Sequence, residues 1–188
     1  GEISGMTAAR GLWFLEYLGH SRVHMLDGGF TAWAAGGYPV ARDAEVAPAQ
    51  AFPFTQNPDV VATYQDVLRL IDAQDGLILD TRSRLEFIGE DVRAARGGAI
   101  PGAVHVEWLE NLTEDGLMKP ADELRRQFEA AGVTLDKEIV AYCQTGYRSA
   151  HAYAALRLLG YPRVRNYLGS WREWGDKTFL PIEVHAGV

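Results

Sequence analysis

The chain of 188 residues contains a single cysteine, and this scarcity narrows the chemistry open to it. One thiol cannot form an internal disulfide, and it cannot build a zinc site from four thiolates. The 5 histidines, at positions 20, 24, 105, 151 and 185, show no spacing typical of metal ligands. We therefore expect no metal and no other cofactor. A thiol that must stay reduced favours a reducing compartment, so we expect a cytoplasmic protein.

The chain also lacks long apolar runs and an excess of cations. No apolar run approaches the roughly 20 residues of a membrane span, and no basic-then-apolar leader is visible. The 18 Lys and Arg residues are outnumbered by 25 Asp and Glu, which gives a net charge of −7. Such an acidic chain lacks the cationic face that binds a phosphate backbone. We expect neither a membrane nor a nucleic acid as partner.

The most informative pattern that is present is an internal repeat. Residues 2–33 align without a gap with residues 143–174, at an offset of 143 − 2 = 141 positions. Glycines and a tryptophan kept in register indicate a duplication. The identical pairs include Gly5/Gly146, Ala9/Ala150, Leu15/Leu156, Leu18/Leu159, Gly19/Gly160, Arg22/Arg163, Val23/Val164, Gly28/Gly169 and Trp33/Trp174. We infer two related domains, of which only the last part of the first is present.

Both copies are predicted to fold in the same way. A loop leads into a helix at residues 8–18 or 150–159, which ends at a glycine. A short strand at 23–26 or 164–167 then leads through a turn into a brief aromatic helix. The stretch 38–58 carries four prolines, at 39, 48, 53 and 58, and is typical of a linker. We therefore divide the chain into 1–40, the end of a non-catalytic domain, 41–58, a linker, and 59–188, a complete catalytic domain.

The complete domain alternates helices with strands. Helices are expected at about 63–71, 83–88 and 121–131, and strands at 77–80, 104–106 and 138–142. Ser83 and Glu86 have the spacing of a capping box. This alternation predicts an α/β fold with an open parallel sheet and helices on both faces. Sites in such sheets lie at the carboxyl ends of the strands.

Cys143 lies at such a carboxyl end, directly after the predicted strand 138–142 and ahead of a helix. Backbone N–H groups of the intervening loop and the positive end of the helix dipole would stabilise a thiolate there. Arg148 could orient an anionic substrate through its paired donors, or be a solvated residue of the first helical turn. The candidate site is the loop Cys143-Gln144-Thr145-Gly146-Tyr147-Arg148, followed by Ser149. The alternative is a buried structural thiol.

Four motifs in order resemble tandem-domain rhodaneses, the thiosulfate and 3-mercaptopyruvate sulfurtransferases. They are the loop at 142–149, the run LDTRS at 79–83, the turn IPGA at 100–103 and the segment YLGSWREW at 167–174. The resemblance covers nearly the whole chain. It implies a rhodanese-like sheet, a silent first domain and a second domain whose Cys143 carries a persulfide. The repeat agrees, because Glu2 stands where the second copy has Cys143, and a carboxylate cannot carry that sulfur.

The resemblance also implies roles for other residues. Asp80 and Arg82 match an Asp-x-Arg element that braces the active-site loop, whereas Trp171 lines the cleft or fills the core. The expected reaction moves a sulfane sulfur from thiosulfate, a small anionic donor, to cyanide or a thiol acceptor. Four residues separate Cys143 from Arg148, one fewer than in cysteine phosphatases, so phosphatase and arsenate reductase activities are less favoured.

Departures from the family pattern leave the donor open. Glu86 and Thr145 stand where some tandem members have Arg and Lys, so fewer cations surround the thiol. Thr145 favours 3-mercaptopyruvate as the donor, whereas Arg148 favours thiosulfate. A persulfide carrier or regulatory module that serves a protein partner is a further alternative. The earlier strands of the first domain are supplied by another segment, are absent, or have been cleaved away.

Overall fold

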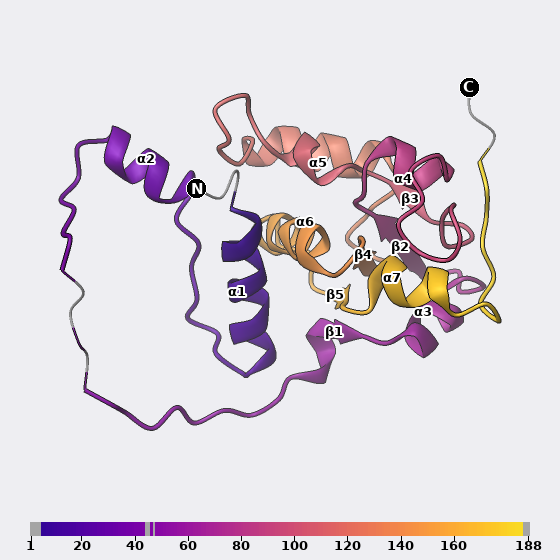
Figure 1. The fold of residues 1–188 in the computed structure, drawn as a ribbon, viewed down its shortest axis with the longest axis horizontal. Helices are drawn as coiled ribbons and strands as arrows, with labels where there is room; N and C mark the ends of the chain where they lie inside the picture. Colours follow the sequence, from indigo (N-terminus) through magenta and orange to yellow (C-terminus); the bar gives the residue numbers. More distant parts are fainter. Residues whose placement is uncertain (1–4, 44–45, 47, 186–188) are drawn as a thin grey trace.

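The protein is built around one parallel sheet of five strands. The computed structural model describes residues 5–43, 46 and 48–185 (Figure 1). Its strands lie in the order β1-β5-β4-β2-β3, and each pairs in parallel with its neighbours. They are β1 (Val61–Ala62), β2 (Gly76–Asp80), β3 (Val104–His105), β4 (Glu138–Tyr142) and β5 (Val164–Tyr167). The predicted α/β fold with a parallel sheet is confirmed.

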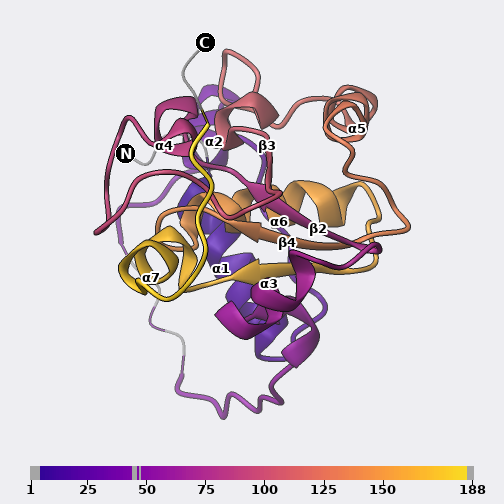
Figure 2. The same cartoon turned by 90° about the vertical axis from the view of Figure 1, so that its right-hand side faces the viewer.

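Helices cover both faces of this sheet (Figure 2). On one face lie α3 (Tyr64–Leu70), α4 (Arg84–Ile88) and α7 (Ser170–Asp176). On the other lie α5 (Ala121–Ala130) and α6 (Tyr147–Leu158). Two short 3-10 helices, η1 (Pro58–Val60) and η2 (Trp108–Asn111), precede β1 and follow β3. Helices on both faces were expected from the alternation of strands and helices.

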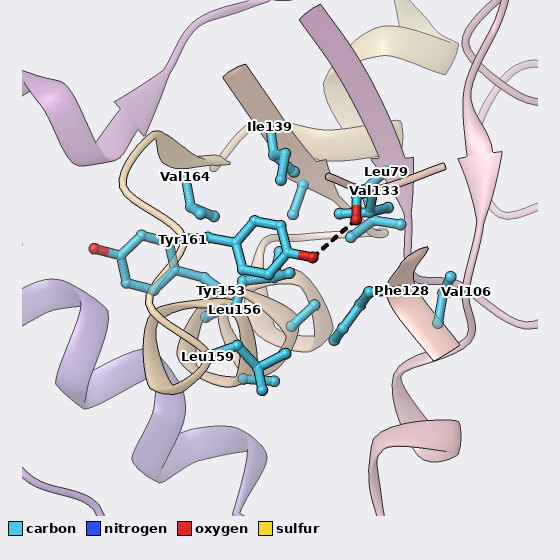
Figure 3. Close-up of a cluster of buried hydrophobic side chains, with 14 of the residues drawn as sticks. Leu79, Val106, Phe128, Val133, Ile139, Tyr153, Leu156, Leu159, Tyr161 and Val164 are labelled. Carbon is cyan, nitrogen blue, oxygen red and sulfur yellow. Dashed lines mark hydrogen bonds between the residues drawn. The ribbon is translucent and has the colours of Figure 1, made fainter. Parts of the chain in front are cut away.

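Period-two alternation along the strands divides the core in two. Leu79 and Ile139 point toward α5 and α6, whereas Ile78 and Val140 point toward α3, α4 and α7. The strands are therefore apolar on both faces, as parallel strands covered twice must be. Figure 3 shows the first cluster, in which the Tyr161 hydroxyl donates a hydrogen bond of 2.8 Å to the carbonyl of Val133.

Helix α1 (Met6–Tyr17) packs against α6 and forms a further layer outside the sheet (Figure 1). It buries Trp13, whose indole N–H donates to the Val60 carbonyl at 2.7 Å. At the far end of α1 the Glu16 carboxylate accepts a hydrogen bond from the Tyr153 hydroxyl, and it lies 3.8 Å from the Arg157 guanidinium. The amino-terminal helix is therefore anchored to α6 and η1 by both apolar and polar contacts.

The helices of the two aligned segments have matching bounds. Met6 and Tyr147, the first residues of α1 and α6, differ by 147 − 6 = 141 positions, and their last residues differ equally. The same offset relates α2 (Gly29–Ala35) to α7. Helix α6 was expected to begin at 150 but begins at Tyr147. Gly146, left-handed at φ +81°, turns the chain directly from the loop into the helix.

The strand expected at 23–26 is absent, so that prediction was wrong. A strand exists only through pairing, and none of the five strands in the described part pairs with this segment. The described residues between α2 and η1 form no helix or strand (Figure 1). The last of them return to the end of α1, where the Thr55 and Asn57 N–H groups donate to the Leu18 and Tyr17 carbonyls at 3.2 and 2.7 Å. Within the described ranges, no helix combines the length and apolarity needed to cross a membrane.

The Tyr161 hydroxyl provides a test of the packing. We expect Tyr161→Phe to lower the free energy of unfolding by about 1–2 kcal/mol, because the buried Val133 carbonyl then loses its donor. Tyr38→Phe is the control, since Tyr38 is 57% exposed, and it should change stability by less than about 0.5 kcal/mol. Urea unfolding followed by circular dichroism measures both. Equal effects of the two substitutions would contradict the structural role of this hydrogen bond.

Candidate active site

Three neighbouring strands bring the site residues to one edge of the sheet. Cys143 follows β4 directly, Asp80 ends β2, and Ser170 begins α7 shortly after β5. The Ser170 hydroxyl accepts the Cys143 N–H at 3.1 Å and donates to the Tyr167 carbonyl at 2.7 Å. Ser170 has a φ of +52°, which is unusual for a residue with a side chain. This strained turn places its hydroxyl beneath the loop.

The Cys143 thiol is buried, with 1% of the residue exposed. The Gly146 N–H donates to its Sγ at 3.1 Å. Burial raises the pKa of the thiol, but the Ser149 N–H and hydroxyl, the Arg148 charge and the Thr145 N–H lower it, and the net shift is downward. Backbone donors thus replace water around the sulfur. The arrangement can hold a thiolate or another anionic sulfur.

Ser149 and Asn166 fix the back of the loop. The Ser149 hydroxyl lies 2.7 Å from Asn166 Oδ1 and 3.6 Å from Cys143 Sγ. It has one proton, so the shorter bond to Asn166 dominates and the sulfur contact is weak. Asn166 in turn donates to the Gly146 carbonyl at 3.2 Å. Asn166 and Ser170 were not recognised from the sequence as site residues, although Ser170 lies within the motif at 167–174.

The loop opens into a cleft of about 490 Å³ between itself and the start of α1. The cleft is lined by Met6, Thr7, Arg93, Trp108, Cys143, Gln144, Thr145, Tyr147 and Arg148. Another cavity of about 490 Å³ lies between α1, the segment 23–27 and α6. That cavity contains no nucleophilic thiol, so the cleft at Cys143 is the candidate active site.

Arg148 is held by a carboxylate. Its Nη1 and Nη2 bind the two oxygens of Glu86 at 2.5 and 2.8 Å. Glu86 also accepts the Ser83 N–H at 3.1 Å, which completes the expected capping box of α4. Burial raises the pKa of Glu86, but Arg148 and Ser83 outweigh it and lower the pKa to about 2. Glu86, recognised from the sequence as a cap and as a departure from the family pattern, therefore sets the position of Arg148.

Asp80 and Arg82 form a fully buried ion pair beneath the loop. Arg82 Nε donates to both carboxylate oxygens of Asp80 at 3.0 Å, and its Nη2 donates to the Gly98 carbonyl at 2.8 Å. The Tyr142 hydroxyl donates to Asp80 at 2.5 Å. Trp171 lies under the guanidinium, 4.4 Å from ring centroid to Cζ, and is 1% exposed. Trp171 thus fills core, and it does not line the cleft.

The remaining predicted loop residues lie around the cleft. The Gln144 side-chain amide donates to the Arg93 carbonyl at 2.7 Å, while Thr145 and Tyr147 are exposed. Arg10, which the sequence did not single out, reaches this loop from α1. Glu2, the expected counterpart of Cys143, lies outside the described residues. Within the described part of the chain, no three His, Cys, Asp or Glu side chains come together as metal ligands.

The chain is similar to several known proteins. A family model described as a rhodanese-like domain matches residues 63–177. A thiosulfate sulfurtransferase of Azotobacter vinelandii is 38% identical over 180 residues, which cover 96% of this chain and 66% of the relative. The sulfur carrier protein TtuD of Thermus thermophilus is 35% identical, over 97% of this chain and 68% of the relative. The chain thus spans 66–68% of the length of these curated relatives.

Solved structures show the same fold. A complex of EanB with ergothioneine covalently linked with a persulfide cysteine is 25% identical, with a TM-score of 0.88. The anaerobic ergothioneine biosynthesis enzyme from Chlorobium limicola, solved with trimethyl histidine, is 26% identical with the same TM-score of 0.88. Each alignment covers 97% of this chain and 46% of the solved chain.

The buried pair of Asp80 and Arg82 leads to a stability prediction. Asp80→Asn removes one charge and leaves Arg82 buried without compensation, so we expect a loss of about 3–5 kcal/mol. Asp122→Asn is the matched control, because Asp122 pairs with Arg126 at 2.9 Å but both side chains are about 70% exposed. It should cost less than about 1 kcal/mol. Chemical unfolding measures both, and a loss no larger than the control's would exclude the bracing role.

The lowered pKa of Glu86 leads to a pH prediction. Its carboxylate contributes stability that is present above its ordinary pKa of 4.5 and is lost as the pH falls toward about 2. Glu86→Gln should therefore destabilise the protein most at neutral pH, and this difference should shrink by at least about 1 kcal/mol between pH 7 and pH 3. Unfolding at several pH values measures it. Glu90→Gln, at an exposed residue, is the control and should change stability by less than about 0.5 kcal/mol.

Proposed function

The chain belongs to the rhodanese-like family, and on that premise we propose that it is a thiosulfate sulfurtransferase. Cys143 takes the sulfane sulfur of thiosulfate and passes it to cyanide or a thiol acceptor. The observation that carries the proposal is the environment of this thiol. The thiol is buried at the carboxyl end of β4, its sulfur accepts a hydrogen bond from the Gly146 N–H, and its pKa is lowered. The relatives named thiosulfate sulfurtransferase support the same reaction.

The reaction proceeds in two half-reactions. The Cys143 thiolate attacks the outer sulfur of thiosulfate, a new sulfur–sulfur bond forms, and the old one breaks as sulfite departs with its electron pair. Cyanide or a thiolate then attacks the outer sulfur of the persulfide, and the Cys143 thiolate leaves with the bonding pair. The Gly146 N–H stabilises the negative sulfur of Cys143 before the first step and after the second.

Arg148 is proposed to orient the oxyanion of the donor. It lines the cleft beside Cys143, and a guanidinium has five N–H donors, of which Glu86 takes two. The bidentate pair fixes the plane of the guanidinium, so that the remaining donors keep a defined direction. Gln144, Thr145 and Tyr147 shape the walls of the same cleft. Asp80 and Arg82 support the loop from below.

We further propose that residues 1–40 end a second, non-catalytic rhodanese-like domain, joined by the linker 41–58 to the catalytic domain 59–188. The offset of 141 positions shared by α1 with α6 and by α2 with α7 supports this duplication. The cleft agrees with it, since Met6 and Thr7 line one wall and the Cys143 loop lines the other. A free thiol at the centre of the reaction favours the cytoplasm as its compartment.

A persulfide carrier is the second candidate function. The sulfur carrier protein TtuD is among the relatives. Both cations that line the cleft are also paired with carboxylates, Arg148 with Glu86 and Arg93 with Asp91 at 2.8 Å. Partial neutralisation weakens the attraction of a free anion such as thiosulfate, whereas a protein partner supplies its own contacts. 3-Mercaptopyruvate remains the rival small donor, favoured by Thr145.

Intact mass spectrometry tests the proposal. Incubation with thiosulfate should add about 32 Da, the mass of one sulfur atom, and cyanide should remove it. Cys143→Ser should show no adduct and no thiocyanate formation, because serine cannot form a persulfide, and Ser170→Ala is expected to load more slowly. Sulfur transfer by Cys143→Ser would overturn the mechanism. Loading without turnover would favour the carrier, and a higher kcat/KM with 3-mercaptopyruvate would name that compound as donor.

A further inference from the structure

We propose that Arg10, on α1, is a positioning residue that holds the Thr145–Gly146 peptide with its N–H directed at the Cys143 sulfur. The proposal rests on the persulfide function proposed above and goes beyond it, because it assigns to the amino-terminal segment a direct role in organising the loop of the complete domain. Arg10 lies outside the residues matched by the family model, which begin at residue 63.

Arg10 and the sulfur bind opposite ends of one peptide unit. Arg10 Nη1 donates to the Thr145 carbonyl at 3.2 Å, while the Gly146 N–H donates to Cys143 Sγ at 3.1 Å. In a planar trans peptide the C=O and the N–H point in opposite directions. The guanidinium on one side and the sulfur on the other therefore fix the same orientation of the peptide. A flip would break both bonds and turn the carbonyl oxygen toward the sulfur.

This peptide needs to be held. Gly146 has a φ of +81° and lacks the side chain that restricts other residues, so rotation about its backbone bonds is cheap. Thr145 is exposed, so its side chain is not locked by packing. A Cβ at Gly146 would lie 2.8 Å from Arg10 Nη1 and 3.0 Å from Leu168 Cδ1. Glycine makes this part of the loop flexible, and neighbouring side chains enclose it. Of the two side chains nearest to that Cβ, Arg10 is charged and Leu168 is apolar.

Arg10 is itself well anchored. Its guanidinium lies 4.7 Å from the ring centre of Tyr147 and 5.3 Å from that of Trp13. Trp13 is 2% exposed and bonded to the Val60 carbonyl, so it is a rigid support. These cation–π contacts fix the guanidinium beside the loop without neutralising it.

Its charge also differs from that of its neighbours. Arg148 and Arg93 are paired with Glu86 and Asp91, and Arg82 is paired with Asp80. Within the described ranges, the contacts of Arg10 are the Thr145 carbonyl and two aromatic rings, with no carboxylate among them. A cation on the carbonyl polarises the peptide and strengthens its N–H as a donor to an anion. Arg10 therefore favours the negatively charged sulfur through the peptide that it orients.

The rate of Cys143 alkylation by iodoacetamide as a function of pH tests this role, because only the thiolate reacts. Arg10→Met removes the donor and the charge but keeps an unbranched apolar side chain. We expect the midpoint of the alkylation profile to rise by about 0.5–1 pH unit, and persulfide formation from thiosulfate to slow by about three- to tenfold. Arg10→Lys, which keeps a charged donor, should recover part of both effects.

Glu16→Gln is the matched control. Glu16 lies on the same helix and contacts α6 through Tyr153 and Arg157, far from the loop along α1. If α1 acted only by docking, then Glu16→Gln and Arg10→Met would shift the profile alike, and the proposal would be overturned. A wild-type midpoint in folded Arg10→Met would overturn it as well. If Arg10→Met does not fold, the midpoint of the alkylation profile is measured on Arg10→Gln, which keeps a neutral donor.

The two proposals fail separately. The alkylation midpoint depends on the thiol and its surroundings, and it requires no sulfur transfer. If the wild-type protein gains no sulfur from any donor while Arg10→Met still raises the midpoint, then the proposed function fails and the positioning role stands. If the wild-type protein loads sulfur and Arg10→Met leaves the midpoint unchanged, then the positioning role fails alone.

Discussion

An anionic sulfur that has lost its water must find hydrogen-bond donors in the protein, and this requirement governs the part of the structure around Cys143. Cys143 is 1% exposed, so solvent cannot stabilise its thiolate. The donors come from a short loop that must curve around the sulfur, which Gly146 allows through its positive φ. A loop of this shape is not stable by itself. Asn166 and Ser170 hold it from behind, and Asp80 with Arg82 supports it from below.

The charged side chains that support the loop are paired with one another. The pair of Asp80 and Arg82 is buried, so the loss of either partner would leave an uncompensated charge in the core. At the cleft, the pair of Glu86 and Arg148 fixes a guanidinium and reduces its net charge. The carboxylate thus holds the Arg148 guanidinium in position but weakens its attraction for free anions. That trade explains why the donor is hard to assign from charge alone.

Much of the fold could be predicted from the sequence because it depends on local patterns. The strand 138–142, the Ser83 capping box and the helix stop at Gly160 are each set by neighbouring residues. The strand at 23–26 failed because strands need partners, which local pattern cannot supply. The thiol was predictable from its place between a strand and a glycine-containing loop. Asn166, Arg10 and the partner of Arg148 were not, since contacts between distant segments depend on packing.

The proposed duplication bears on the position of Arg10, the cation at the loop that has no carboxylate partner within the described ranges. Glu16 and Arg157 are equivalent positions under the offset of 157 − 16 = 141, and they lie 3.8 Å apart. Equivalent positions meet in this way near a twofold axis, as in an isologous interface. The same offset relates Arg10 to His151, and burial lowers the pKa of His151 to about 4, against the opposing charge of Asp27. Arg10 thus places a permanent cation at the loop that has the thiol, whereas the His151 ring packs against Trp108, 5.4 Å between ring centroids. The two aligned segments thus differ in charge at this pair of positions as well as at Glu2 and Cys143, and both differences favour an anionic sulfur at Cys143.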